Sequence, residues 1–482
     1  MAARSVVLGI DLGTTSVKAA VVEAAPDDPS GFVVLASCVR AARAEAAAQS
    51  AAAGPQAQEQ DVSRIIQALN ECLAALPRQQ LRQVGGIGVS GQMHGVLFWK
   101  TGQGCEWTEG GAAPAFTPRA VSHLVTWQDG RCDSEFLASL PRPESHLSVA
   151  TGFGCATIFW LLKNRCENSP EFLKSYDAAG TIHDYVVAML CGLPRPLMSD
   201  QNAASWGYFN TQSQSWNVEI LRASGFPVHL LPDIAEPASV AGRTAHAWFE
   251  IPKGTRVGVA LGDLQASVYS CMAQRTDAVL NISTSVQLAA SMPVGFQPAQ
   301  TPDPAAPVAY FPYFDRTYLA VAASLNGGNV LATFVQMLVQ WMADLGVEVE
   351  ESTVYSRMIQ AAAEQRDTCL TITPTVLGER HLPDQLASVT RISSEALSLG
   401  HVTRALCRGI VQNLHSMLPS QQLREWGVER VVSSGSALSR NEVLKQEVQR
   451  AFPFPVSFGQ DVDAAVGAAL VMLQRNLHQE ES

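Results

Sequence analysis

The chain has 482 residues, of which 47% are hydrophobic, 16% charged and 7% aromatic. This composition argues against a disordered or fibrous protein. The net charge of −11 argues against a nucleic-acid partner, because phosphate neutralisation requires a basic surface. Single cores stop growing beyond about 250–300 residues, so we expect two domains with a ligand cleft between them.

The cysteine and apolar patterns indicate a cytoplasmic protein. Ten cysteines are scattered without a CxxC pair, which argues against structural zinc and against a disulfide framework. The first apolar run, residues 6–10, is too short for a secretory signal. No uncharged apolar run reaches the roughly 20 residues of a transmembrane helix, so we expect no membrane partner.

The first half of the chain opens with a predicted hairpin. Residues 5–10 and 16–23 are strand-like, and residues 11–15 form the polar turn between them. Residues 41–60 are rich in Ala and Gln and predict a mobile connection. A helix follows over residues 62–76, with Asp61 as its cap and Pro77 as its stop.

Two further strands in this half end in polar residues. Residues 84–90 predict a strand that leads into Gly91-Gln92-Met93-His94-Gly95. Residues 257–261 predict a buried strand that ends in Gly262-Asp263.

The second half repeats the opening pattern. Strands are predicted at residues 279–282 and 286–290, with the hydroxyl-rich turn Ser283-Thr284-Ser285 between them. Amphipathic helices are predicted over residues 402–418 and 462–477. We infer a duplicated α/β architecture with one phosphate-binding turn in each half.

The first turn has the groups that bind an anion. Gly13, Thr14 and Thr15 offer N–H and O–H donors, and Lys18 adds a positive charge. Asp11 could hold Mg²⁺ together with phosphate oxygens. Asp, Gly and Thr also favour an ordinary β-turn, so this motif alone does not decide. The matching turn at 283–285 favours phosphate.

Asp263 is the predicted catalytic base. A carboxylate placed directly after a buried strand is costly unless it has a partner or a role. In phosphoryl transfer such a group accepts the proton of the attacking hydroxyl. The alternative is an N-cap for a helix over residues 264–272.

The predicted sugar-binding residues follow strand ends. The amide of Gln92 and the imidazole of His94 can each donate and accept hydrogen bonds, although a structural histidine remains an alternative. Trp127 offers a flat apolar face, beside the polar Asp129 and Arg131. The alternative there is a half-buried core tryptophan beside a surface salt bridge, which suits Arg131 better than Asp129.

Two nucleotide motifs are discounted. Residues 86–91 spell GxGxxG, but they lie within the predicted strand itself rather than after one, so a dinucleotide site is not indicated. The hypothesis of an NAD oxidoreductase would rest on this GxGxxG string alone. The chain has no GxxxxGK[ST], which excludes a P-loop.

Together these segments resemble the FGGY carbohydrate kinases, from Gly9 to about Leu473. The matching stretches are GIDLGTTSVKA, Glu59-Gln60-Asp61, SGQMHG, WQDGR, His183-Asp184-Tyr185, Gly262-Asp263-Leu264-Gln265, Ser283-Thr284-Ser285, Leu377-Gly378-Glu379-Arg380 and Gly435-Ser436-Ala437-Leu438-Ser439. The resemblance implies an α/β fold with two actin-like, ribonuclease-H-type domains and a ligand cleft between them. We expect the domains to span residues 1–270 and 271–482.

The resemblance also implies roles for individual residues, with ATP, Mg²⁺ and a small-molecule sugar as ligands. The ATP phosphates would contact Gly13, Thr14, Thr15, Lys18, Thr284 and Ser285, and the metal would lie at Asp11 and Asp263. The adenosine would contact Gly328, Gly435, Ser436, Ala437 and Asn441. The sugar would contact Gln92, Met93, His94, Trp127, Asp129 and the base Asp263.

The motif SGQMHG resembles the branch of the family that acts on xylulose and related ketoses. The chain departs from the family pattern at Thr157, where Lys is usual, at Leu264, where Asn or Gln is common, and at Ser283 and Val286, where Gly is common. These departures fit a specificity different from glycerol or xylulose. The alternatives are another ketose kinase, a non-catalytic sugar or nucleotide sensor, and an actin- or chaperone-like ATPase.

Overall fold

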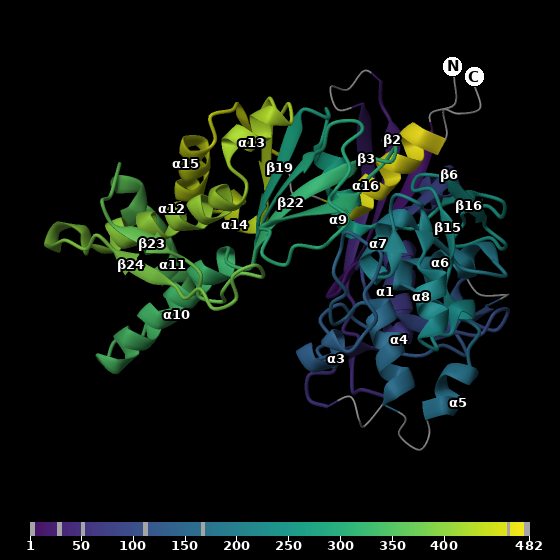
Figure 1. The fold of residues 1–482 in the computed structure, drawn as a ribbon. Coiled ribbons are helices and arrows are strands. Elements are labelled where there is room, and N and C mark those ends of the chain that lie inside the picture. The colour runs from purple at the N-terminus through teal and green to yellow at the C-terminus, as the bar shows by residue number, and fades with distance from the viewer. Residues whose placement is uncertain are drawn as a thin grey trace.

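The computed structural model describes residues 5–26, 31–49, 54–108, 114–164, 169–459 and 463–476. The chain forms two lobes, each built around a large mixed sheet, with the first lobe at the right and the second at the left of Figure 1. Within the described residues, no helix is long and apolar enough to cross a membrane.

The sheet of the first lobe has the strand order β16-β17-β6-β1-β2-β3, and β18 also pairs with β6. β1, β2 and β3 run antiparallel in succession, whereas β6 is parallel to β1, and β17 is parallel to β6. The strands are β1 (Val6–Leu12), β2 (Ser16–Ala24), β3 (Phe32–Ala41), β6 (Val84–Gly91), β16 (Val240–Arg243), β17 (Arg256–Gly258) and β18 (Leu261–Gly262).

The sheet of the second lobe has the order β21-β22-β20-β19-β25-β26. β19, β20 and β22 run antiparallel in succession, whereas β25 is parallel to β19, and β26 is parallel to β25. The strands are β19 (Asp277–Ile282), β20 (Val286–Ser291), β21 (Val308–Pro312), β22 (Tyr318–Ser324), β25 (Arg430–Ser434) and β26 (Val456–Phe458).

The two sheets therefore share one pairing pattern. The order β3-β2-β1-β6-β17 in the first lobe corresponds to β22-β20-β19-β25-β26 in the second, with the same strand directions. In each lobe the first hairpin carries the hydroxyl-rich turn. The predicted duplicated α/β architecture is confirmed.

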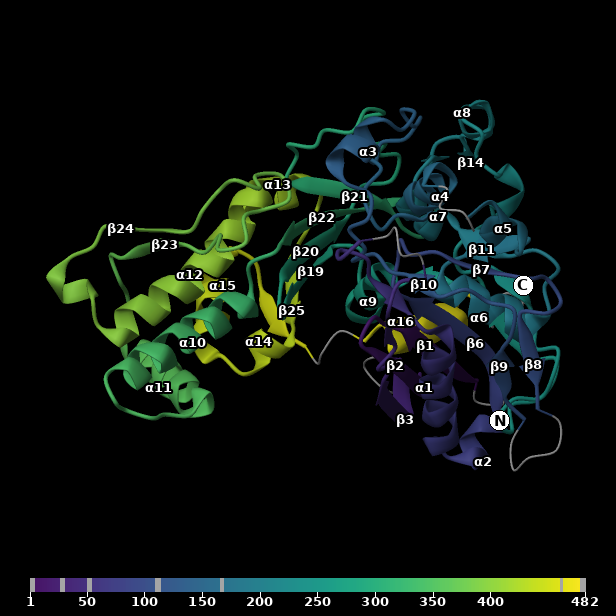
Figure 2. The same cartoon turned by 90° about the horizontal axis from the view of Figure 1, so that it is seen from below.

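Helices cover both sheets (Figure 2). The first lobe has α1 (Val62–Ala75), α2 (Arg78–Leu81), α3 (Ser134–Ala138), α4 (Gly154–Lys163), α5 (Ser169–Lys174), α6 (Ile182–Cys191), α7 (Asp200–Trp206), α8 (Val218–Ala223), η2 (Val228–Leu230) and α9 (Asp263–Cys271). The second has α10 (Gly328–Asp344), α11 (Glu351–Glu364), η3 (Ser394–Ala396), α12 (Leu399–Met417), α13 (Ser420–Glu425), α14 (Ser436–Ser439) and α15 (Glu442–Ala451). The chain continues with α16 (Ala464–Val471) and the π-helical η4 (Met472–Asn476).

Short strand pairs and one small three-stranded sheet complete the fold. They are formed by β4 (Glu45–Ala46), β5 (Glu59–Gln60), β7 (Leu97–Trp99), β8 (Cys105–Trp107), β9 (Phe116–Pro118), β10 (Leu124–Val125), β11 (Ala178–Gly180), β12 (Leu197–Ser199), β13 (Phe209–Asn210), β14 (Ser215–Trp216), β15 (Asp233–Ala235), β23 (Thr371–Thr373) and β24 (Ser388–Thr390). Most of these pairs lie in the first lobe.

The predicted helix at residues 62–76 is confirmed. Asp61 caps α1 by accepting a hydrogen bond from the Ser63 N–H, and Leu76 ends the helix just before Pro77. The helix at residues 402–418 corresponds to α12, whose apolar face is buried in the core of the second lobe.

Three predictions need correction or completion. The strand expected at residues 257–261 is split into β17 and β18, because the Val259 N–H donates to Ser239 O instead of continuing the ladder. Parts of the expected mobile connection form β4 and β5, which pair with each other, although residues 50–53 lie outside the described residues. The last predicted helix becomes π-helical after Val471, and its expected ends, Val462 and Leu477, lie outside the described residues.

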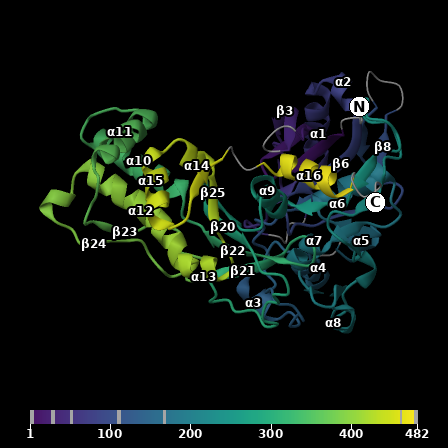
Figure 3. The ribbon, with the colours of Figure 1, turned by 90° about the horizontal axis from the view of Figure 1, so that it is seen from above.

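The C-terminal segment crosses back to the first lobe. The yellow α16 packs on β1, β6 and α9, as the views in Figures 1 and 3 agree. A division at residue 270 therefore separates the two sheets, but residues 463–476 belong in space to the first lobe. Glycines make this contact possible, because a Cβ on Gly9 or Gly88 would overlap the backbone of α16.

This packing yields a stability prediction within one strand. Gly88→Ala should lower the free energy of unfolding by about 1–3 kcal/mol, because the added methyl group forces α16 away from β6. Gly85→Ala in the same strand is the control, since its Cβ would meet no atom closer than 3.9 Å. Chemical unfolding of both variants makes the comparison, and equal midpoints would contradict the assignment.

Candidate active site

Three adjacent strand ends bring the predicted catalytic residues together. In the first sheet Asp11 of β1 lies opposite Ser90 of β6, and Gly262 of β18 lies opposite Gly91. Asp11, Gln92 and Asp263 therefore leave the same edge of the sheet. Carboxyl ends of parallel strands are where open α/β sheets bind ligands.

The charge of Asp263 acts on the carboxylate of Asp11. Asp11 is buried, and its burial together with the charge of Asp263 raises its pKa to about 7, although Lys18 opposes this rise. Lys18 is the cross-strand partner of Asp11 in the hairpin. Burial raises the pKa of Asp263 to about 6. Two such carboxylates resist simultaneous ionisation unless a cation joins them.

Asp263 is the first residue of α9 rather than its cap. Gly262 occupies the cap position, and Asp263 Oδ1 accepts a hydrogen bond of 2.7 Å from the Leu264 N–H. Gln201 of α7 fixes the turn by accepting a hydrogen bond from the Gly262 N–H at 3.3 Å. The N-cap alternative therefore does not explain this carboxylate.

Thr14 connects the first turn to the predicted sugar-binding residues. Its hydroxyl accepts a hydrogen bond from Trp127 Nε1 at 2.9 Å and donates to Gln92 Oε1 at 3.5 Å. Gln60 Nε2 donates to Thr14 O at 2.7 Å, and Gln60 Oε1 accepts from Gln92 Nε2 at 3.0 Å. Gln60 is therefore part of the site, although from the sequence it was only a member of the motif Glu59-Gln60-Asp61.

His94 is held in one orientation and one tautomer. Its Nδ1 lies 2.8 Å from Ser205 O, which can only accept, so Nδ1 carries the proton and Nε2 keeps a free lone pair. Burial lowers the pKa of His94 to about 4, so the ring is neutral near pH 7. The ring stacks on Phe153 with centroids 4.5 Å apart. His94 is therefore anchored through Nδ1, and within the described part of the chain its Nε2 accepts no hydrogen bond.

Trp127 and Met93 also lie at this edge. Trp127 is 39% exposed, so its ring face is available although its N–H is engaged. Met93 is buried, and its thioether lies so close to Gly262 that a Cβ on Gly262 would overlap it. The sugar contact predicted for Trp127 and Met93 stays a prediction.

Gln92 and Asp129 differ from the prediction that they face the sugar. Gln92 is only 2% exposed, and its amide already bonds to Thr14 and Gln60. Asp129 is fully buried, and both its oxygens accept hydrogen bonds from Arg131 and from the backbone of Gln58. The hydrogen bonds of both side chains are thus made within the protein.

The salt bridge expected at the surface is instead part of the interior. Arg131 Nη2 donates to Asp129 Oδ2 at 2.9 Å and to Glu59 Oε1 at 2.7 Å. All three side chains are buried. Asp129 and Arg131 follow Trp127 closely in the chain, so this network connects the segment that carries Trp127 to β5.

In the second lobe, three distant segments meet around the turn at residues 283–285. Gly328 N–H donates to Ser283 O at 2.7 Å, and the Ser436 N–H donates to Ser283 Oγ at 3.2 Å. A Cβ on Gly328 would overlap the turn, and Gly435 has a φ of 116° that favours glycine. Thr284 and Ser436 are exposed at this junction. Most residues predicted to bind ATP in this lobe are therefore close together.

Asn441 is an exception. It is fully buried, and its Oδ1 accepts hydrogen bonds from the Val443 and Leu444 N–H groups as the cap of α15. Its Nδ2 contacts Cys407 Sγ at 3.6 Å. The structure gives Asn441 a capping role in place of the expected contact with adenosine.

Glu379 supports the glycines that follow β22. It is buried, and its carboxylate accepts hydrogen bonds from Ser324, Asn326, Asn413 and the Leu325 N–H. The network fixes the chain directly before Gly327 and Gly328. The motif containing Glu379 was visible in the sequence, but its partners lie 34 to 55 residues away, so no local pattern revealed its role.

The donor set suits a cation shared with phosphate rather than an all-protein metal cage. Among the described residues there is no group of three or more His, Cys, Asp or Glu that could hold a metal ion. Asp11 Oδ1 is buried and has no hydrogen-bond partner among the residues that the structure describes. Mg²⁺ commonly takes one or two carboxylates together with substrate phosphates, so Asp11 and Asp263 fit that ion.

Comparison with known proteins identifies the family. Residues 6–269 match the FGGY family of carbohydrate kinases, N-terminal domain. The chain belongs to the FGGY family of carbohydrate kinases. It is 88% identical over 482 residues to sedoheptulokinase from Homo sapiens and 86% identical over 481 residues to sedoheptulokinase from Mus musculus, with full coverage of both chains in each case.

Solved structures of more distant relatives share this carbohydrate-kinase fold. Xylulose kinase from Rhodospirillum rubrum superposes with a TM-score of 0.77 at 19% identity, covering 97% of this chain and 89% of that chain. Plasmodium falciparum glycerol kinase with ADP gives a TM-score of 0.73 at 16% identity, covering 97% and 89%. The expected actin-like α/β fold is confirmed.

Proposed function

We propose that this FGGY kinase transfers the γ-phosphoryl group of ATP to the terminal hydroxyl of sedoheptulose. The product would be sedoheptulose 7-phosphate for the pentose phosphate pathway. The choice of sedoheptulose as the substrate rests on the 88% identity to human sedoheptulokinase along the whole chain. The placement of Asp263 beside Asp11 and the Thr14 turn supports the chemistry.

Asp263 acts as the general base in this proposal. Its carboxylate takes the proton of the sugar hydroxyl while the sugar oxygen bonds to the γ-phosphorus and the bond to the β,γ-bridging oxygen breaks, releasing ADP. A pKa of about 6 leaves Asp263 mostly ionised near pH 7 and still basic enough to accept that proton. Asp11 and Asp263 would hold Mg²⁺, which neutralises charge on the phosphates when bound.

The turns supply the remaining phosphate contacts. Gly13, Thr14, Thr15 and Lys18 would bind the phosphates from the first lobe, and Thr284 with Ser285 from the second. The adenosine would lie along Gly328, Gly435, Ser436 and Ala437. Asn441 would act indirectly, because it caps the helix that follows these residues.

The sugar would lie between Trp127 and His94. The exposed face of Trp127 suits the C–H surface of a sugar, and the free Nε2 of His94 can accept a hydrogen bond from a hydroxyl. Met93 would contact the sugar beside the base. Gln92 and Asp129 would position Thr14 and Trp127 rather than touch the ligand.

We also propose that the enzyme works in the cytoplasm. The nine described cysteines are all free thiols, which suits a reducing compartment.

Asp263→Asn tests the base directly. Asparagine keeps the shape and an oxygen that can accept from the Leu264 N–H, but it cannot take a proton at neutral pH, so kcat should fall at least 100-fold while sugar affinity changes little. For the wild type, kcat/KM should fall as the pH drops below about 7, and more steeply below about 6, because Asp11 and then Asp263 become protonated there. Asp384→Asn, an exposed carboxylate, is the control. Near-normal turnover of Asp263→Asn would rule out this base.

A sugar panel tests the substrate. Magnesium-dependent ADP release should be strong with sedoheptulose and weak with D-xylulose, D-ribulose, glycerol or no sugar. A preference for xylulose or glycerol would keep the family and reject the substrate. Release without any sugar would indicate an ATPase, and no release at all would favour a sugar or nucleotide sensor.

A further inference from the structure

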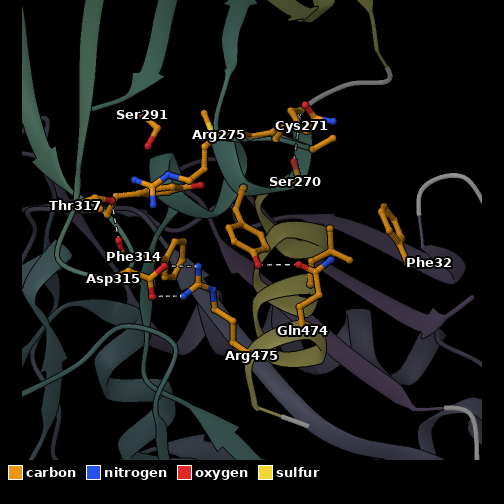
Figure 4. A pocket seen from close by; sticks show the side chains of 16 residues that line it. Phe32, Ser270, Cys271, Arg275, Ser291, Phe314, Asp315, Thr317, Gln474 and Arg475 are labelled. Carbon is orange, nitrogen blue, oxygen red and sulfur yellow. Dashed lines mark hydrogen bonds and ion pairs between the residues drawn. The ribbon is translucent and has the colours of Figure 1, made fainter. Parts of the chain in front are cut away.

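A cavity lies at the junction of the two lobes. It has a volume of about 550 Å³, within the range of small-molecule sites. Its lining comes from the end of α9, from the connector 272–276 that leads into the second lobe, from the turn between β21 and β22, and from η4 (Figure 4). Both lobes therefore contribute to its walls.

Three hydrogen-bond donors in this cavity have no acceptor among the described residues. Arg275 extends into it from the exposed connector, and no hydrogen bond or ion pair joins its guanidinium to the described part of the chain. Ser291 is only 5% exposed, and its Oγ has no hydrogen-bond partner. The Tyr313 hydroxyl likewise has none in the described segments, and burial raises the pKa of this phenol, so it remains a donor.

The carboxylate that lines the cavity is already neutralised. Asp315 accepts hydrogen bonds from Arg475 Nη1 at 2.7 Å and from Nη2 at 3.0 Å, and this ion pair is drawn with dashed lines in Figure 4. The charged lining residues are two arginines, Arg275 and Arg475, and one carboxylate, Asp315, whose pKa both arginines lower. The cavity is therefore locally positive in a chain with a net charge of −11.

Aromatic side chains supply the apolar part of the wall. Tyr269 and Phe314 pack edge-to-face with ring centroids 5.1 Å apart, and Arg475 lies 4.8 Å over the ring of Phe314. The Tyr269 hydroxyl donates to Gln474 Oε1 at 2.7 Å, which fixes the ring. A ligand here would meet an apolar surface on one side and hydrogen-bond donors on the other.

We propose that this cavity binds a small organic anion, with a phosphate or carboxylate head held by Arg275, Ser291 and Tyr313. A guanidinium and two hydroxyls match either head group, because both are rich in acceptors. The ligand's body packs on Tyr269 and Phe314. Since the walls belong to both lobes, the bound anion restrains their relative movement. This proposal is independent of the sugar kinase chemistry, because none of these residues belongs to the proposed catalytic site.

Isothermal titration calorimetry with phenyl phosphate and with benzoate tests the proposal on the full chain. Arg275→Gln removes the charge while keeping a similar length, and it should weaken binding at least tenfold. Ser291→Ala and Tyr313→Phe should each weaken it by a smaller factor. Arg316→Gln is the matched control, since Arg316 is exposed in the turn between β21 and β22 but does not line this cavity.

The outcomes separate the possibilities. Loss of binding in Arg275→Gln with unchanged binding in Arg316→Gln supports the site, and the probe that binds more tightly identifies the head group. If neither probe binds the wild type, or if Arg275→Gln binds both as tightly as the wild type does, the proposal is wrong. Circular dichroism of each variant verifies the fold, and sugar kinase activity is not needed for either conclusion.

Discussion

The electrostatic coupling of Asp11 and Asp263 is the constraint on which the candidate site depends. Adjacent strand ends place both carboxylates at one edge of a buried sheet, where desolvation raises both pKa values and the charge of Asp263 raises that of Asp11 further. Lys18, opposite Asp11, relieves only part of this unfavourable charge. In the proposed function, a cation bound with the nucleotide phosphates would remove the remainder of this unfavourable charge.

The hydroxyl-rich turns of the two lobes differ in their neighbouring residues. The turn of the second lobe follows Asn281, whereas the matching turn of the first follows Asp11. The second turn therefore offers hydroxyl and N–H donors without a competing carboxylate, and glycines at 327, 328 and 435 allow its neighbours to approach closely. In the proposed function, metal and base chemistry would belong to the first lobe. Close packing of α16 against Gly9 and Gly88 holds the strands that carry it.

Local patterns predicted the hairpins, the capped helix α1 and the strand end at Asp263, because strand period, turn residues and capping are short-range signals. They did not predict the burial of Gln92 and Asp129 or the capping role of Asn441. Those depend on partners such as Gln60 and Arg131, and on which side of a loop faces the core. The return of α16 to the first lobe is likewise a long-range packing effect that small residues permit but do not specify.

Proton release on binding of Mg²⁺·ADP tests the coupled carboxylates most directly. Calorimetry at pH 6.5 in buffers of different ionisation enthalpy measures it. We expect net proton release, because Asp11, with a pKa of about 7, is largely protonated before the cation binds and ionised afterwards. Asp11→Asn should lose that release. Binding without proton release in the wild type, or equal release in Asp11→Asn, would contradict the account.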